Sequence, residues 1–276
     1  MPFSFNNLAS SNSTAIMGII NLSPDSFYSR SIPRSISGVF NVAKKMIQEG
    51  VHILDVGAET TRPGSKGISV KLELERLLPV ITKLTKEFDI PISVDTYKPE
   101  VASVVLQEGV SIINDISGLG AGYKMANVIA RHKAGVVLMH MKGTPETMQN
   151  KPYYKDVCAE VLNFLSRRIM QAEEAGIDFE SIAIDPGIGF GKTLTHNVDL
   201  ITKLDQLKVL GKQILLGVSR KSFIGDILNL EPAERLEGSI AAGIVGVING
   251  ANILRVHDVG STMRAVRVVK ALRKRI

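Results

Sequence analysis

The chain has 276 residues, a length that suits one α/β barrel and is short for two domains. Hydrophobic residues make up 45% and charged residues 22%, which is a globular balance with enough apolar material for one large core. The formal net charge of +6 raises the question of nucleic acid, but no recognition motif accompanies that charge. Much of the excess lies in a basic helical pattern at the C-terminus. We therefore expect no nucleic-acid partner and consider an anionic substrate instead.

Cys158 is the only cysteine of the chain, which excludes an internal disulfide and a cysteine-based zinc site. The single thiol fits the reducing environment of the cytoplasm, where we expect the protein to act, although a cysteine-poor secreted protein would look the same. The N-terminal residues contain no basic region followed by an apolar run, so we expect no signal peptide. No apolar stretch approaches the length of a membrane span, so we expect no membrane partner.

Eight short apolar runs alternate with helical patterns along the chain. The runs are almost continuously hydrophobic, which is typical of parallel strands covered by helices. Amphipathic helices are predicted between them, for example over residues 72–88 and 157–175. We therefore predict an α/β fold, a single-domain TIM (β/α)8 barrel over residues 1–276 with an N-terminal extension at 1–13. The predicted strands are residues 15–21, 52–57, 91–96, 111–116, 136–140, 182–186, 213–218 and 253–256.

Nearly every predicted strand ends in polar or charged side chains. In such barrels the chemistry lies at the carboxyl ends of the strands. One polar residue would usually mark only the passage from strand to loop, but eight converging ends predict a binding site. The mixture of anions, amides and cations predicts a ligand with a donor face and an anionic part. In chain order the ends carry Asn21, Asp55 and Glu59, Asp95, Asn114 and Asp115, His140, Asp185, Ser219 to Lys221, and Arg255 with His257.

The glycine-rich residues 187–193 look like a phosphate loop but do not fit its pattern. Pro186 stands where GxxxxGK[ST] requires glycine, and Leu194 stands where GxGxxG requires its last glycine. The chain also lacks an HExxH motif and any other His–carboxylate cluster typical of a tightly held transition metal. A nucleotide loop and a resident transition metal are therefore not expected.

Several separated motifs, in a fixed order from Ile16 to about Val259, closely resemble the dihydropteroate synthase family. The first two are GIINLSPDSF at residues 18–27 and DVGAETTRPGS at 55–65. One motif alone would be weak evidence, whereas all of them on one barrel are highly specific. The others are SVDT at 93–96, NDISG at 114–118, MHMKGTPETMQ at 139–149, DPGIGFGK at 185–192, GVSRKSFIG at 217–225 and RVHD at 255–258.

The resemblance implies an enzyme of folate biosynthesis that condenses 6-hydroxymethyl-7,8-dihydropterin diphosphate with p-aminobenzoate. Its products would be 7,8-dihydropteroate and diphosphate, and sulfonamides would compete as aminobenzoate mimics. A pterin presents a ring N–H beside an exocyclic amine, and one carboxylate can accept both hydrogens. The resemblance gives that role to Asp185 and surrounds the pterin with Asp95, Asn114, Met139 and Lys221.

Departure of diphosphate requires cations and a metal where negative charge develops. Arg255 and His257 alternate along the last strand, so both can point into the barrel, although alone they could equally form a rim ion-pair set with Asp258. Asn21 resembles the asparagine that the family associates with Mg²⁺, so the resemblance implies a diphosphate site of Asn21, Arg255 and His257. We expect catalysis to rest on Asn21, Asp95, Lys221 and Arg255.

The aminobenzoate requires an apolar slot and a site for its carboxylate. A predicted short helix beginning at Ser222 offers free backbone N–H groups. The family also implies a homodimer, and the Gly/Ala-rich stretch 239–247 is a candidate face, although a helix packed within the barrel would have the same pattern. The expected aminobenzoate residues are Thr61, Arg62, Pro63, Phe190, Ser222 and Phe27.

The first loop departs from the family pattern. The family continues DSFSDGG, whereas this chain has DSFYSRS at residues 25–31. Ser29 replaces an acidic residue that the family associates with the pterin cation, and Arg30 replaces a glycine. The change leaves open an active enzyme with a retuned loop, slower turnover or altered use of small ligands. The pterin and anion residues are intact, which favours activity.

Two other functions fit parts of the same sequence. A pterin-binding methyltransferase would share the barrel and the pterin carboxylates, but the run from Ser219 to Gly225 and the pair Arg255 and His257 favour diphosphate and aminobenzoate. A non-catalytic pterin-binding paralogue would explain the altered first loop. The synthase remains the prediction that accounts for most motifs.

Overall fold

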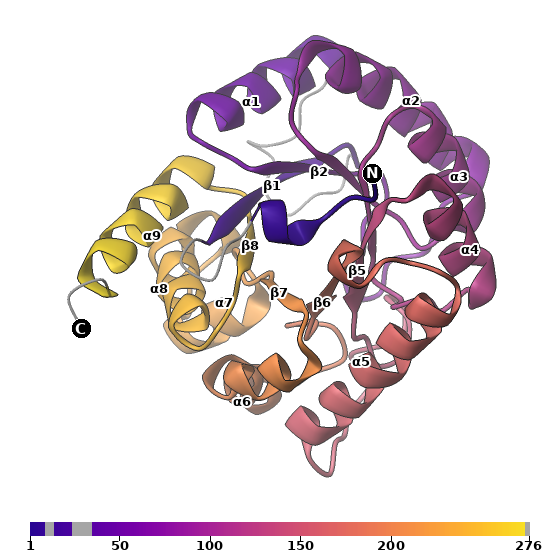
Figure 1. Ribbon diagram of the computed structural model, residues 1–276. Helices are drawn as coiled ribbons and strands as arrows, with labels where there is room; N and C mark the ends of the chain where they lie inside the picture. The colour runs from indigo at the N-terminus through magenta and orange to yellow at the C-terminus, as the bar shows by residue number, and fades with distance from the viewer. Residues whose placement is uncertain (9–13, 24–34, 274–276) are drawn as a thin grey trace.

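The computed structural model describes residues 1–8, 14–23 and 35–273. Within them, eight parallel strands close into a barrel in the order of the chain, and helices surround it (Figure 1). The predicted TIM barrel is therefore confirmed. Phe27, Ser29 and Arg30, on which the sequence analysis of the first loop depends, lie outside the described residues.

The strands lie where the apolar runs predicted them, with bounds that differ by a few residues. The barrel closes because β1 pairs with β8, with Ala15 opposite Ile253 and Gly18 opposite Val256. The observed strands are β1 (Ala15–Asn21), β2 (Ile53–Gly57), β3 (Ile92–Asp95), β4 (Ile112–Asp115), β5 (Gly135–Met139), β6 (Ile182–Asp185), β7 (Gln213–Leu216) and β8 (Ile253–Val256).

The α-helices of the described chain form the outer layer. Several begin at side-chain caps: the oxygens of Ser35, Ser69, Asp156 and Thr193 accept backbone N–H groups of the first turn. None of these helices combines the length and the apolar character that a membrane span requires. Their bounds are α1 (Ile36–Gln48), α2 (Val70–Glu87), α3 (Pro99–Gln107), α4 (Tyr123–His132), α5 (Val157–Glu174), α6 (Leu194–Thr202), α7 (Ser222–Leu228), α8 (Leu236–Ile248) and α9 (Val259–Arg273).

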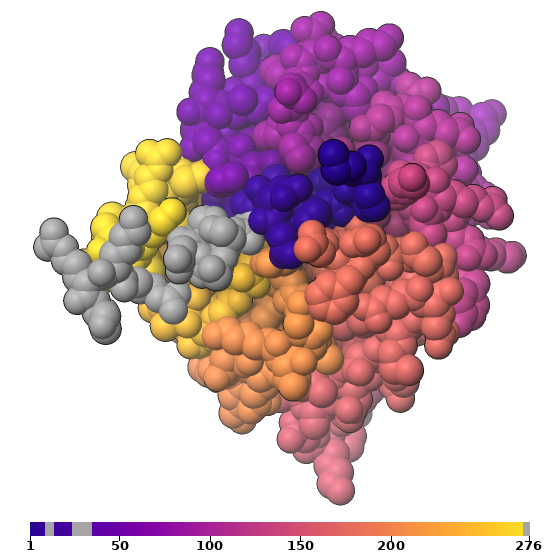
Figure 2. Space-filling model, viewed as in Figure 1, coloured from indigo at the N-terminus to yellow at the C-terminus, as the bar shows by residue number. Residues whose placement is uncertain are grey.

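Short 3₁₀ helices complete the described structure, and the first of them closes one end of the barrel. This helix, η1 (Phe5–Asn7), lies across the barrel opening in Figure 1, and Figure 2 shows the same segment at the centre of that face. Phe5 belongs to the predicted N-terminal extension, yet it is fully buried against the inner core. Its neighbours there include Met17, Ile53, Ile112, Val137, Leu215 and Ile253. The other 3₁₀ helices are η3 (Phe179–Ser181), η4 (Leu204–Leu210) and η5 (Pro232–Glu234).

We call the segment Phe5–Asn7 the plug, and removal of its Phe5 side chain should destabilise the whole barrel. Because Phe5 is fully buried, we expect Phe5→Ala to lower the free energy of unfolding by about 3–5 kcal/mol. Urea denaturation followed by circular dichroism measures this change. The matched control is Tyr153→Ala, because that aromatic side chain is 74% exposed and should cost far less. Equal midpoints for the two variants would contradict a structural role for the plug.

Candidate active site

A cavity of about 200 Å³ lies at the carboxyl ends of the strands. Strand register brings distant residues together there, because Asn21 pairs with Gly57, which in turn pairs with Asp95. Asn114 lies opposite Asp95 on the next strand. The predicted residues Asn114, Met139 and Asp185 are buried and do not line the cavity. The sequence-predicted residues that line the cavity are Asn21, Thr61, Arg62, Pro63, Asp95, Phe190, Lys221, Ser222, Arg255 and His257.

Arg255 is the charged centre of the site. Its Nε donates to Asp55 Oδ2 at 2.7 Å, and its Nη2 donates to Asp95 Oδ2 at 2.9 Å. Asn114 Nδ2 lies 3.4 Å from the same Asp55 oxygen. Two carboxylates therefore fix the guanidinium, and among the described residues no hydrogen bond reaches its Nη1, which is left for a ligand. The rim pair proposed between Arg255 and Asp258 is absent from the described contacts, because Asp258 binds Arg220 instead.

Asp55 is a functional residue to which the sequence analysis gave no role. It is fully buried in β2, between apolar neighbours, and its carboxylate orients Arg255 through the hydrogen bond from Nε. A charged residue inside a strand covered on both faces indicates such a role, because burial of a carboxylate requires a partner. The identity of that partner, two hundred residues away in the sequence, came only from the structure.

The same cluster shifts the titration of its members. Burial raises the pKa of Asp95 to about 7, with the Asp55 carboxylate adding to the rise and Arg255 partly offsetting it. Burial alone would lower the pKa of Arg255, but the carboxylates of Asp55 and Asp95 raise it above its ordinary value. Arg255 therefore stays charged while Asp95 titrates near neutrality.

We call Asp185 and Lys221 the deep end of the site, because the almost fully buried Asp185 carboxylate acts on the charge of Lys221, which lines the cavity. Asp185 is almost fully buried, and its Oδ1 accepts the Gly187 N–H at 2.7 Å, so part of this carboxylate does cap the following loop. Among the described residues no hydrogen bond reaches its Oδ2, which remains for a ligand. Met139 lies opposite Asp185 in the strand register and is equally buried. Lys221 Nζ donates to the Ile188 carbonyl.

Lys221 also faces the aromatic wall of the cavity, because its Nζ lies 4.8 Å from the centre of the Phe190 ring. Burial lowers the pKa of Lys221 to about 8, although the carboxylate of Asp185 acts in the opposite direction. A lysine with this pKa is charged at neutral pH and sits beside the pterin carboxylate predicted from the sequence.

His257 is held as a neutral hydrogen-bond donor at the opposite side of the cavity. Ser219 Oγ accepts the His257 backbone N–H at 3.2 Å and lies 2.9 Å from His257 Nδ1. We assign the hydroxyl proton to that second contact, which places the imidazole proton on Nε2. Burial and, to a lesser extent, the charge of Arg255 lower the pKa of His257 to about 4, so the ring stays neutral.

The loop that carries Thr61, Arg62 and Pro63 is anchored by Glu59. One oxygen of Glu59 accepts the Tyr97 hydroxyl at 2.7 Å, and the other accepts the Ile68 N–H at 3.0 Å. Lys98 bridges Glu59 and the buried Glu73. The sequence analysis recognised Glu59 as a strand-end residue but missed Tyr97, Lys98 and Glu73, which lie on other elements.

The tip of the loop is held as well, because the Gly64 N–H donates to the Pro145 carbonyl at 2.9 Å. The loop of Thr61 to Pro63 is therefore held at its base by Glu59 and at its tip by the Pro145 carbonyl. Within the described residues, no group of three or more His, Cys, Asp or Glu side chains could hold a metal ion.

The mouth of this closed barrel brings together carboxylates, a lysine, an arginine and a neutral histidine. This combination is typical of enzymes that bind small, partly anionic molecules. Comparison with protein families agrees, because the family model described as "Pterin binding enzyme" matches residues 17–257.

Individual relatives narrow this class. The dihydropteroate synthase of Synechocystis sp. is 45% identical over 260 residues, which cover 94% of this chain and 90% of the relative. The Yersinia pestis dihydropteroate synthase, solved with a sulfonamide drug, superposes with a TM-score of 0.93 at 36% identity, covering 99% of this chain and 100% of that chain. The Xanthomonas albilineans enzyme with 4-aminobenzoic acid gives a TM-score of 0.87 at 40% identity, covering 95% and 93%. The chain belongs to the dihydropteroate synthase family.

The two shifted groups of the site predict a bell-shaped pH profile. We expect that Asp95 loses its proton, with a pKa of about 7, in order to accept a pterin hydrogen, and that Lys221 keeps its proton, with a pKa of about 8. We expect kcat/KM for the pterin substrate to rise through the first value and fall through the second. Steady-state rates of the wild type and of Asp95→Asn between pH 5 and 10 test this. Retention of the same acidic limb in Asp95→Asn would assign that limb to another group.

Proposed function

We propose that the chain condenses 6-hydroxymethyl-7,8-dihydropterin diphosphate with p-aminobenzoate to form 7,8-dihydropteroate and diphosphate. Membership of the dihydropteroate synthase family supports this reaction. The observation that carries it is the convergence of Asp95, Lys221, Arg255 and His257 on one cavity. The buried carboxylate of Asp185 lies close enough to Lys221 to act on its charge, and Arg255 with His257 provides donors for an anion at the mouth.

Recognition of the pterin rests on the deep end. The ring N–H and the exocyclic amine of a pterin form a donor pair that Asp185 accepts, while Lys221 donates to the carbonyl side of the ring. Asn114 and Asp95 provide an amide and a carboxylate for the remaining polar edge, and Met139 contributes an apolar surface. All five side chains come from strand ends or from residues just after them, so their positions are fixed before the substrate binds.

The reaction at the mouth depends on stabilising the negative charge that develops as diphosphate leaves. The amine nitrogen of p-aminobenzoate attacks the methylene carbon, a C–N bond forms, and the C–O bond to diphosphate breaks. The arylamine then releases one proton to solvent or to the departing diphosphate. Arg255 Nη1 and the Nε2–H of His257 stabilise the negative charge on that leaving group, and Asn21 lies beside them. The nucleophile is neutral, so orientation replaces a strong base.

The aminobenzoate slot would lie between the anchored loop and the wall after β6. Phe190 and Pro63 flank the ring, with Thr61 and Arg62 on the loop and Ser222 near the carboxylate. Phe27 stays a prediction for the same slot. The X. albilineans enzyme binds 4-aminobenzoic acid, and the Y. pestis enzyme binds a sulfonamide drug, so we propose that sulfonamides compete for this slot.

A magnesium ion fits the mouth only together with its substrate. Mg²⁺ prefers six oxygens and is commonly bound through one or two protein ligands, waters and substrate phosphates. A Cβ added at Gly57 would lie 3.8 Å from Asn21 Oδ1 and 3.5 Å from Asp95 Cβ, so an amide oxygen and a carboxylate adjoin there. Asn21 would hold the ion. The bound ion would supply positive charge to the diphosphate, and the protein's own cations would remain necessary.

The decisive measurement is diphosphate release with and without p-aminobenzoate. We expect release that depends on aminobenzoate and that matches the formation of dihydropteroate mole for mole, because the two bonds change together. Pterin binding without turnover would identify a non-catalytic paralogue. Transfer of a methyl group from a folate without diphosphate release would identify a methyltransferase.

We also propose that the chain acts as a homodimer in the cytoplasm, with the single thiol of Cys158 supporting that location. The glycines of the predicted Gly/Ala-rich face point inward: a Cβ at Gly246 would lie 2.1 Å from Leu216, and one at Gly243 would lie 3.5 Å from Leu254. Close packing on the barrel therefore explains these glycines. Apolar side chains exposed on α7 and α8 offer the dimer face instead, namely Ile227, Leu228, Val245 and Ile248.

A charge in this face should separate the subunits. We expect Val245→Asp to shift the species in sedimentation velocity from dimer to monomer, because association would then bury an unpaired carboxylate. Val268→Asp, on α9 and 59% exposed, is the matched control and should leave the dimer intact. A dimer that persists in Val245→Asp would place the interface elsewhere.

A further inference from the structure

Lys192 is a buried lysine that the reaction described above does not use. It lies in the loop after β6, the same loop that carries Phe190, and only 3% of it is exposed. No carboxylate of the described residues lies within ion-pair distance of its Nζ. Burial lowers the pKa of this amine well below its usual value, while the charge of Asp185 opposes that shift. A buried lysine without a paired carboxylate is costly, so its retention requires a reason.

Three acceptors around Lys192 oppose this effect of burial, because hydrogen bonds from the charged form favour the ammonium group. Its Nζ lies 2.9 Å from His140 Nδ1, 3.0 Å from the Phe190 carbonyl and 3.4 Å from the His140 carbonyl. An ammonium has three hydrogens to donate, and all three neighbours can accept when the imidazole is neutral. Burial and the adjacent lysine both lower the pKa of His140, which keeps that ring neutral.

These contacts connect directly to the pterin carboxylate. The His140 backbone N–H donates to the Asp185 carbonyl at 3.0 Å, so β5 and β6 are joined at the residue that we assign to pterin recognition. On the other side, Lys192 fixes the carbonyl of Phe190, whose ring forms the wall beneath Lys221. One side chain therefore ties together the deep carboxylate and the aromatic wall.

Glycines allow the two loops to approach this closely. Gly187 and Gly191 both have positive φ values, of 70° and 67°. A Cβ at Gly187 would lie 1.9 Å from the His140 carbonyl oxygen, and one at Gly191 would lie 2.5 Å from the Lys142 carbonyl oxygen. The glycine-rich run that resembles a phosphate loop thus packs against the loop after β5.

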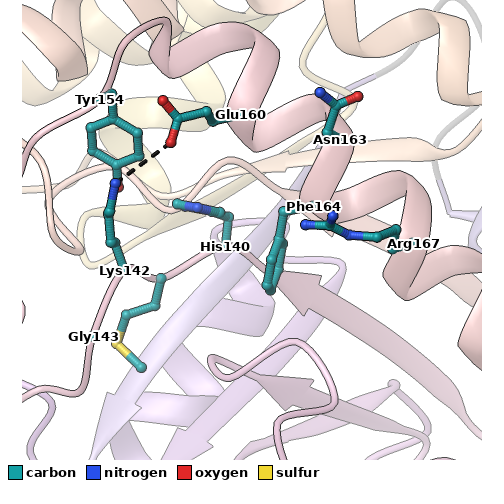
Figure 3. Close-up of a pocket in the computed structure, with 9 residues that line it drawn as sticks. His140, Lys142, Gly143, Tyr154, Glu160, Asn163, Phe164 and Arg167 are labelled. Carbon is teal, nitrogen blue, oxygen red and sulfur yellow. Dashed lines mark hydrogen bonds and ion pairs between the residues drawn. The ribbon is translucent and has the colours of Figure 1, made fainter.

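The other side of His140 faces a second cavity, of about 430 Å³, between the loop after β5 and α5 (Figure 3). The imidazole lies edge-on to Phe164, with ring centres 4.9 Å apart, and the centre of the Tyr154 ring lies 6.1 Å from that of the imidazole. Tyr154 in turn donates its hydroxyl to the Gly191 carbonyl at 2.8 Å. His140 therefore separates this outer cavity from Lys192.

We propose that Lys192 and His140 form a positioning pair for the pterin site, in which His140 Nδ1 holds the Lys192 ammonium so that it orients Asp185 and Phe190. The proposal rests on the proposed function, because Asp185 is the pterin ligand. Neither residue touches the substrate. Their effect is exerted through the loop after β6, and it depends on an acceptor at Nδ1 rather than on an aromatic ring.

The first test replaces the two members by matched pairs of variants. We expect Lys192→Met to weaken binding of 6-hydroxymethyl-7,8-dihydropterin, measured by calorimetry, by about 10- to 100-fold, as is typical when the outer partner that orients a ligand-binding group is removed. His140→Phe should cause a similar loss, because phenylalanine fills the space without an acceptor. His140→Asn should stay within about threefold of wild type, because its amide oxygen takes the place of Nδ1. Lys142→Met, in the outer cavity, is the control and should bind normally.

The second test uses the outer cavity and remains valid if the first variants fold poorly. In His140→Ala the space of the lost ring should join that cavity, so an added imidazole can enter it. We expect imidazole to restore pterin affinity by at least about fivefold, whereas pyrrole, which has the same size but no acceptor nitrogen, should not. Rescue by both rings would show that His140 only fills space.

Pterin binding by the wild type and by the variants distinguishes failure of the positioning pair from failure of the proposed function. A wild-type chain that does not bind the pterin would remove the proposed function. Normal pterin binding by the wild type together with equal affinity in Lys192→Met and His140→Phe would overturn the positioning pair alone. Loss of affinity in Lys192→Met and His140→Phe, retention in His140→Asn and selective rescue by imidazole support it.

Discussion

The site depends on one physical constraint, which is that several charges are buried together and each must be balanced by a neighbour. Arg255 is shared between Asp55 and Asp95, and removal of a partner from a buried pair typically costs about 3–5 kcal/mol. This balance fixes the guanidinium before any substrate arrives. An anion at the mouth then meets a donor whose orientation has already been set by folding, which is the condition for effective electrostatic catalysis.

Support for that centre comes from outside the cavity. Glu59, with Lys98 and Glu73 behind it, holds the loop of Thr61 to Pro63, and Lys192 with His140 holds the loop after β6. Both devices place a lysine between acceptors on different elements. The strands provide the substrate-binding groups, and these two lysines hold the intervening loops in place, as the second layer of a functional site must.

The sequence predicted the barrel well because eight apolar runs with helices between them leave few other folds. It also predicted that Asn21, Asp95, Lys221 and Arg255 lie around one cavity, since polar residues at strand ends converge in such a barrel. The partner of Arg255 and the bridge from Lys98 to Glu73 could not be predicted, because strand register and helix rotation decide those contacts. The sequence excluded a nucleotide loop at the glycine-rich residues 187–193 but gave no other reason for these glycines, which the structure explains by close packing against the loop after β5.

The burial of Phe5 beneath the barrel has a consequence for how the protein is made. Strand β1 pairs on one side with β8, the last strand of the barrel, and the inner core around Phe5 includes Ile253 of β8. During synthesis from the N-terminus, the beginning of the chain therefore waits for nearly the whole sequence before its partners exist. Such non-local closure slows folding and leaves apolar strands exposed meanwhile. The nascent chain is thus most vulnerable to aggregation just before its final strand leaves the ribosome.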